Sequence, residues 1–365
     1  MIRLLRSEEL RSLISLILFL FISPGMATVD KLHLTIATTH PTTLPWAALL
    51  RDYFVPVSTG KIEAIYPSID LEWHQAYGTL YKWQDSLNGL KIGLSDIGWV
   101  GSLWESSRLP LQNITYDLPF ITDDLSSLLR VMNDLHHDIP EMQQSWLDND
   151  LKFLAATGTD TYHLVTNFPV RTVADLKGKK ILAPGAASIW LEGTGATAIN
   201  GALTTYYTQL KTGVADGAVT ILSGAYPFRL HEVAQYVTLV GIGAQFVGAL
   251  AANLEVWNRL PQSVQEIFVE VARDYSRLSA EAANQRYVES LEALQREGAI
   301  LYTLPLIEKE KWMKSLPPLA SNWVDRHQAS NLPAQLVLNK LMLGLKSEGV
   351  RPTNSWGVDL LGTDK

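Results

Sequence analysis

Three runs within residues 162–220 decide the fold: Tyr162-His-Leu-Val-Thr166, Lys179-Lys-Ile-Leu-Ala-Pro184 and Tyr207-Thr-Gln-Leu-Lys-Thr-Gly-Val-Ala-Asp-Gly217. The first run predicts a short apolar strand. The second predicts a strand that stops at Pro184, because proline has no amide proton to donate to a ladder. Between them, Thr172 and Asp175 have the spacing that caps a short helix. Open α/β sheets bind ligands just past the carboxyl ends of their strands. This stretch therefore predicts a ligand-binding α/β lobe, and we recognise no catalytic motif in it.

The preceding part of the chain predicts a second lobe of the same kind. Apolar patterns predict strands at 32–38, 61–67 and 94–100, with a helical segment over 73–90 between the last two. Strands and helices that alternate at this spacing favour βαβ units and a mostly parallel sheet. At 365 residues the chain is long enough for two lobes, each with its own core.

The longest helical pattern follows these lobes. Apolar residues keep a helical period from Pro261 to about Glu297, and at 1.5 Å per residue this gives a helix of roughly 55 Å. Such a helix is longer than one lobe is wide, so we predict that it braces both. Strands at 151–156 and 237–247 are expected to cross between the lobes. The predicted division is lobe I at 28–159, lobe II at 160–245, a return to lobe I at 246–285, and lobe II with the C-terminal helices at 286–365.

Residues 1–27 predict a signal peptide. A basic start, an apolar run, a break and small residues before a cleavage point follow one another, namely Arg3 to Arg11, Leu13 to Ile22, Ser23-Pro24 and Gly25-Met-Ala27. An uncleaved membrane anchor is the alternative, but the run is shorter than the ~20 residues that span a bilayer. We predict cleavage after Ala27, a periplasmic location and no stable membrane insertion afterwards.

Composition narrows the classes of partner. The chain has no cysteine, which suits an exported protein whose core is large enough without disulfides. Removing residues 1–27 leaves 27 basic and 35 acidic side chains, net −8, which argues against nucleic acid or an anionic membrane as partner. Gly193-Thr-Gly-Ala-Thr-Ala198 has a dinucleotide-binding spacing but does not join a strand to a helix. With no metal or nucleophile motif, we predict no cofactor, no metal and no enzyme activity.

Several segments resemble the periplasmic solute-binding proteins of TRAP transporters, the DctP type. They are, in family order, Leu118-Pro-Phe120, Pro169-Val-Arg-Thr-Val-Ala-Asp-Leu-Lys-Gly-Lys-Lys-Ile181, Tyr207 to Gly217, His231-Glu-Val-Ala-Gln-Tyr-Val-Thr238 and Trp257 to Pro261. The resemblance covers most of residues 30–300. It implies an α/β, two-lobed fold with crossover strands and closure around one solute by a hinge motion. It also implies delivery of that solute to TRAP membrane permease subunits, driven by an ion gradient.

Three positions depart from the family pattern. Leu182 stands where the family usually has an arginine that grips a solute carboxylate with two hydrogen bonds. Tyr162 stands where sugar-acid and dicarboxylate binders commonly have a second arginine, and Thr220 where asparagine is frequent. Leucine cannot hydrogen-bond an anion, and a buried carboxylate without partners costs several kcal/mol. The resemblance therefore does not carry a dicarboxylate over to this chain.

We predict instead a cleft with an aromatic and weakly polar lining: His40, Trp73, Trp99, Tyr162, Leu182, Leu203, Tyr206, Thr220 and Tyr226. Such a lining suits an aromatic, neutral or monoacid solute better than a dicarboxylate. Arg229, Arg171 or His74 could still supply a cation. The predicted function is an extracytoplasmic solute receptor. A periplasmic sensor protein for a signalling partner and a periplasmic hydrolase are the alternatives.

Overall fold

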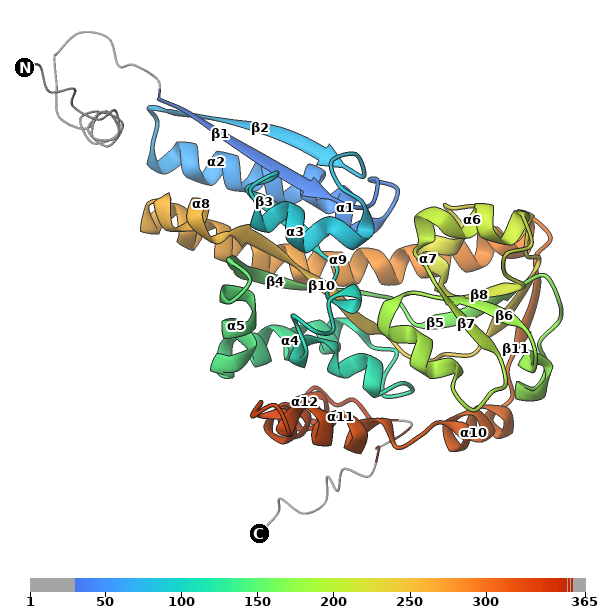
Figure 1. The fold of residues 1–365 in the computed structure, drawn as a ribbon. Coiled ribbons are helices and arrows are strands. Elements are labelled where there is room, and N and C mark those ends of the chain that lie inside the picture. Colours follow the sequence, from blue (N-terminus) through green and yellow to red (C-terminus); the bar gives the residue numbers. More distant parts are fainter. Residues whose placement is uncertain (1–29, 353, 355, 357–365) are drawn as a thin grey trace, which may run out of the picture.

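The computed structural model describes residues 30–352, 354 and 356, and it has two lobes, each built on its own β-sheet (Figure 1). The predicted signal peptide lies outside the described residues. The sheets confirm the α/β, two-lobed fold. One apolar cluster runs through both lobes, from Ile36 in the first sheet to Ile181 in the second. The lobes therefore share part of their core and meet along a broad contact.

The first sheet has five strands, in the order β2 (Ile69–Tyr77), β1 (Asp30–Thr38), β3 (Ile97–Val100), β10 (Gln245–Asn253) and β4 (Leu151–Thr159). β1 pairs in parallel with β2 and β3, whereas β10 is antiparallel to β3 and β4. The carboxyl ends of β1 and β3 therefore reach the same edge of the sheet. This is the edge where open α/β sheets bind their ligands.

The second sheet has six strands, in the order β11 (Ile300–Thr303), β9 (Tyr236–Leu239), β5 (Tyr162–Thr166), β8 (Gly217–Ile221), β6 (Lys180–Ala183) and β7 (Thr197–Asn200). β6 is parallel to β7 and β8, and β11 is parallel to β9. The antiparallel pairs of this sheet both involve β5. Both sheets are thus parallel except around β10 and β5, the strands that begin directly after the chain has crossed between the lobes.

Two crossovers and one long helix join the lobes before the C-terminal helices return to the first lobe. β4 ends at Thr159 and β5 begins at Tyr162, while β9 ends at Leu239 and β10 begins at Gln245. The third connection is the helix α9 (Gln262–Arg296), whose 35 residues confirm the predicted long helix. α9 packs on β4, α1 and α4 in the first lobe and on α7 in the second, and Figure 1 shows it running along both.

The remaining helices cover the sheets. Their bounds are α1 (Pro45–Leu49), α2 (Val55–Ile65), α3 (Ser86–Lys91), α4 (Leu125–Asp138), α5 (Pro140–Leu147), α6 (Leu203–Lys211), α7 (Leu222–Ala225), α8 (Leu254–Arg259), α10 (Leu306–Ser315), α11 (Leu319–Gln328) and α12 (Ala334–Ser347). α12 packs on α4, so the end of the chain returns to the first lobe. None of the helices within the described residues combines the length and the apolar character that crossing a membrane requires.

Two predicted elements are wrong. Residues 61–65 are the end of α2 rather than part of a strand, and β2 occupies 69–77, which overlaps the start of the segment predicted as helix. Both stretches mix apolar and polar residues over only a few positions, and periodicity alone does not separate helix from strand in such short runs. The pairing of β2 with β1 along its whole length decides the outcome.

Candidate functional site

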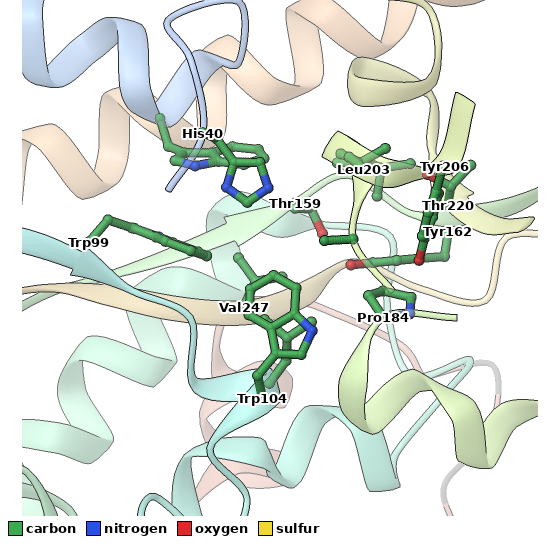
Figure 2. A pocket seen from close by; sticks show the side chains of 14 residues that line it. His40, Trp99, Trp104, Thr159, Tyr162, Pro184, Leu203, Tyr206, Thr220 and Val247 are labelled. Carbon is green, nitrogen blue, oxygen red and sulfur yellow. The ribbon is translucent and has the colours of Figure 1, made fainter. Parts of the chain in front are cut away.

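A cavity of about 410 Å³, counting the part open to solvent, lies where the two lobes meet (Figure 2). Its lining comes from the first lobe (His40, Trp46, Trp99, Leu103, Trp104, Thr159 and Val247) and from the second (Tyr162, Pro184, Ala202, Leu203, Tyr206, Thr220 and Ile221). Figure 2 shows His40, Trp99 and Trp104 on one side, facing Tyr162, Leu203, Tyr206 and Thr220 on the other.

Four rings build the wall contributed by the first lobe. The imidazole of His40 lies edge-on to Trp46 and Trp99, with ring centroids 5.7 and 5.6 Å apart, and it stacks at 6.4 Å on Trp104. Trp46 and Trp99 stack on each other at 6.2 Å. Such contacts add about 0.5–1.5 kcal/mol per pair beyond the burial of area. The wall is therefore a rigid aromatic surface whose rings hold one another in place.

The local secondary structure explains where each of these rings lies. His40 follows the carboxyl end of β1, and Trp99 lies in the neighbouring strand β3. Trp46 is in the first turn of α1, where Pro45 occupies a position at which its missing amide proton costs nothing. Trp104 ends a single helical turn that begins at Ser102, directly after β3. Adjacent parallel strands thus place all four rings at one sheet edge.

Some polar atoms of the lining have a hydrogen-bond partner within the protein, and others have none. The indole Nε1 of Trp99 donates to Thr157 Oγ1 at 2.8 Å, and His40 Nδ1 lies 2.8 Å from Thr39 Oγ1. Within the described residues, the buried Trp46 Nε1, Trp104 Nε1 and Tyr206 Oη have no hydrogen-bond partner. The Oγ1 atom of Thr159, also in the lining, has none in the described part of the chain either. A buried polar group without a partner costs about 1–3 kcal/mol, so a solute that bonds any of these atoms would recover that cost.

The titratable groups in the lining are uncharged at neutral pH. Burial lowers the pKa of His40 to about 4, so its imidazole is neutral. Burial raises the pKa of Tyr162 to about 12, although the hydroxyls of Thr159 and Tyr116 beside it counter part of that effect. Burial also raises the pKa of Tyr206 well above its ordinary value, with a smaller contribution from the nearby phenol of Tyr162.

A buried carboxylate lies next to the cavity, on the crossover between β4 and β5. The Oδ2 atom of Asp160 accepts the backbone amides of Leu222 at 3.1 Å and Ser223 at 3.3 Å, and its Oδ1 atom accepts the Ser223 hydroxyl. Burial nevertheless raises the pKa of Asp160 to about 7. These bonds tie the crossover to the start of α7, directly after Ile221.

The structure brings six of the predicted site residues together around the cavity: His40, Trp99, Tyr162, Leu203, Tyr206 and Thr220. It places the other three elsewhere. Trp73 lies in β2, where its Nε1 donates to Thr59 Oγ1 at 2.9 Å and its ring packs edge-on against Phe54 and Phe268. It is absent from the cavity because the segment is a strand and not the predicted helix.

Leu182 and Tyr226 are also away from the cavity. Leu182 points from β6 into the fully buried apolar cluster that holds Tyr206 and Leu210, and its short side chain does not reach the opening. The hydroxyl of Tyr226 donates to Glu297 Oε1 at 2.6 Å, and its ring stacks on His231. Leu182 lies within β6, two residues before the lining residue Pro184, whereas Tyr226 directly follows α7.

Several lining residues were not predicted from the sequence, above all Trp46 and Trp104. A signal for both was present, because each follows the carboxyl end of a predicted strand within a few residues. Thr159 and Val247, on the crossover strands, carry no comparable signal. Their side chains are ordinary strand residues, and only the meeting of the two lobes brings them to the cavity.

A comparison with protein families agrees with this architecture. Residues 68–326 match the model DctP, bacterial extracellular solute-binding protein, family 7. The chain belongs to this family. The match confirms the resemblance to TRAP solute-binding proteins that the sequence suggested, and it places the chain among periplasmic binding proteins rather than among enzymes.

Individual relatives cover most of the chain. The C4-dicarboxylate-binding protein DctB of Bacillus subtilis strain 168 is 25% identical over 250 residues, which are 66% of this chain and 69% of that protein. A TRAP solute-binding protein from Rhodoferax ferrireducens T118, solved with copurified benzoate, has a TM-score of 0.76 at 17% identity over 87% of this chain and 98% of its own. A marine metagenome TRAP protein specific for aromatic acids, solved with 3-hydroxybenzoate, has a TM-score of 0.75 at 16% identity over 87% and 99%.

Proposed function

We propose that this DctP-family protein is the receptor of a TRAP transporter for a small aromatic solute with a single ring. The observation that carries the proposal is the wall of four mutually packed rings, from His40, Trp46, Trp99 and Trp104, which faces a second wall with two tyrosines. A flat solute between two such walls buries both of its faces. Burial of a ring-sized apolar group is worth about 1.5–3 kcal/mol.

The lining argues against a dicarboxylate. Among the described residues, no lysine or arginine lines the cavity, and an ionised carboxylate that leaves water without a cation or enough donors pays a large penalty. The solved TRAP proteins that hold benzoate and 3-hydroxybenzoate support a ring as the common element. The name of the Bacillus subtilis relative points to a dicarboxylate, for which this lining offers no counter-charge.

In this proposal the chain is exported, its signal peptide is cleaved after Ala27, and the mature protein works in the periplasm. The lobes open and close about the two crossovers and α9. The closed, loaded form delivers its solute to the TRAP membrane permease subunits. Binding and release, without chemical change to the solute, are the whole cycle.

A thermal-shift screen of the mature protein tests the proposal. The panel contains benzoate, benzamide and benzyl alcohol as one-ring compounds, with succinate and glucuronate as non-aromatic acids. A ligand present at 100 times its Kd stabilises the folded state by about 2.7 kcal/mol, so we expect the melting temperature to rise only with one-ring compounds. A rise with succinate or glucuronate alone would refute the aromatic solute.

Two variants make the test specific for the cavity. Trp104→Ala removes a ring from the wall and should abolish the ligand-induced shift. Trp73→Ala removes a half-buried tryptophan of β2 that lies outside the cavity, and it should lower the melting temperature while leaving the shift intact. Equal loss of the shift in both variants would mean that the effect reports on stability and not on binding.

A further inference from the structure

The polar atoms that line the cavity are all uncharged, and this bears on the head group of the solute. The lining holds an imidazole, indoles, phenols, threonine hydroxyls and backbone, and its described members include no lysine, arginine, aspartate or glutamate. The imidazole of His40 does not supply a positive charge, because its burial keeps it neutral. A solute in this cavity therefore meets hydrogen-bonding groups and no cation.

The charged group next to the cavity has the wrong sign for an anionic solute. Asp160 lies between Thr159 and Tyr162, which are both lining residues, and it is 2% exposed. The influence of its carboxylate reaches the cavity, since it is among the causes that raise the pKa of Tyr162, after the larger effect of burial. An ionised solute would thus be held without a counter-charge and beside a carboxyl group.

The buried N–H groups without partners can be satisfied only by hydrogen-bond acceptors. Trp46 Nε1 and Trp104 Nε1 belong to the wall of the first lobe, and an indole N–H can only donate. Tyr206 belongs to the wall of the second lobe, and its Oη can donate or accept. Trp99 differs, because Thr157 already satisfies its Nε1 atom. Acceptors on the solute would satisfy atoms from both lobes at once.

We propose that the cavity selects an uncharged aromatic compound bearing a hydrogen-bond acceptor, such as an amide, a ketone or an alcohol, over the carboxylate of the same shape. Trp46, Trp104 and Tyr206 supply the hydrogen bonds to the acceptor, while the lack of a lysine or arginine in the described lining and the nearby Asp160 disfavour the anion. The inference rests on the proposed function and narrows it. A receptor that excludes the carboxylate would deliver an uncharged solute for transport into the cell.

Calorimetric titration with benzamide and with sodium benzoate at pH 7.5 separates the two proposals, because these compounds have nearly the same shape and differ in charge. We expect benzamide to bind at least about tenfold more tightly, which is 1.4 kcal/mol. Benzoate binding as tightly as benzamide, or more tightly, would overturn the preference for uncharged solutes and leave the aromatic receptor standing. Failure of both, together with failure of benzyl alcohol, would contradict the aromatic receptor itself.

The variant Tyr206→Phe tests the acceptor argument with a readout that a purely structural role would not produce. It removes a buried hydroxyl without a partner, so the free protein should keep or raise its melting temperature. Loss of the bond to the solute should weaken benzamide binding by about 5- to 30-fold. The matched control is Tyr66→Phe, since the Tyr66 hydroxyl bonds Ser263 Oγ at 2.5 Å, outside the cavity. The control should lower the melting temperature and leave the affinity unchanged. Unchanged benzamide affinity in Tyr206→Phe would remove Tyr206 from the site.

Discussion

Replacement of Asp160 by asparagine should make the protein less sensitive to alkaline pH. The carboxylate is buried on the crossover and has a pKa of about 7, against a reference value of 3.8. Asparagine keeps one oxygen to accept the amides of Leu222 and Ser223, and its amide group can donate to the Ser223 hydroxyl. The hydrogen-bonding pattern around the crossover can therefore survive while the charge is lost.

The size and sign of the effect follow from the two pKa values. Because the pKa is higher in the folded protein, the folded state binds more protons than the unfolded state between about pH 4 and pH 7, and stability falls as pH rises through this window. The slope is about 1.4 kcal/mol per pH unit, and the whole loss is about 4 kcal/mol, nearly complete by pH 8.

Urea denaturation followed by tryptophan fluorescence, at pH 5, 6, 7 and 8, measures the effect. The difference in unfolding free energy between the wild-type protein and Asp160→Asn isolates this one group, since the other titrating groups are shared. We expect the difference to move in favour of the variant by about 2.5 kcal/mol from pH 5 to pH 8. A difference that does not change with pH would refute the assignment of a raised pKa to Asp160.

Three further substitutions test other parts of the structure. Gly185→Ala should weaken solute binding about tenfold or more and increase the radius of gyration measured by small-angle scattering. The reason is that Gly185 has a φ of +49° and a Cβ atom there would lie 2.2 Å from Leu103 O of the other lobe. Unchanged binding would show that this contact does not limit closure. Trp99→Phe should lower the free energy of unfolding by about 1–3 kcal/mol, measured with urea, since it leaves Thr157 without the buried indole donor; a stability equal to wild type would contradict this. His40→Gln should reduce the loss of stability between pH 6.5 and pH 4 by about 3 kcal/mol. The reason is that burial lowers the pKa of His40 in the folded protein to about 4, so the unfolded state binds a proton that the folded state does not. Parallel profiles of unfolding free energy against pH for the two proteins would exclude this role of His40.

The sequence predicts the fold far better than it predicts the site. The long helix and the second-lobe strands at Tyr162 and Lys180 follow from apolar patterns and from the break at Pro184, whereas the strand β8 was not predicted. The start of the first lobe is harder. The run at 61–67 and the strand β2 are both short and mixed, and the edge pairing of β2 with β1 decides between helix and strand.

The position of a residue along its strand explains the error at Leu182. Leu182 and Thr220 both belong to strands of the second sheet, yet Thr220 lines the cavity and Leu182 enters the cluster around Leu210. β6 pairs with β8 so that Leu182 lies beside Ala218, two residues before Thr220. The two side chains therefore share one face of the sheet, and only Thr220 lies far enough along its strand to reach the cavity. The position of a strand in the sequence predicts the edge of the sheet, whereas the facing lobe decides which side chains meet the solute.

The energetics of the cavity connect its aromatic wall to the unpartnered donors. Burial of a single ring contributes about 1.5–3 kcal/mol, whereas a micromolar Kd corresponds to about 8 kcal/mol. Ring burial alone therefore does not bind a solute tightly. An arginine would bring a charge-assisted bond, but the position of Leu182 offers none. Hydrogen bonds to Trp46, Trp104 and Tyr206 relieve the cost of three buried polar atoms, and they do so only when the lobes are closed on the solute. The donors without partners thus make closure depend on the solute, which is the property that a receptor needs in order to deliver loaded rather than empty protein to a permease.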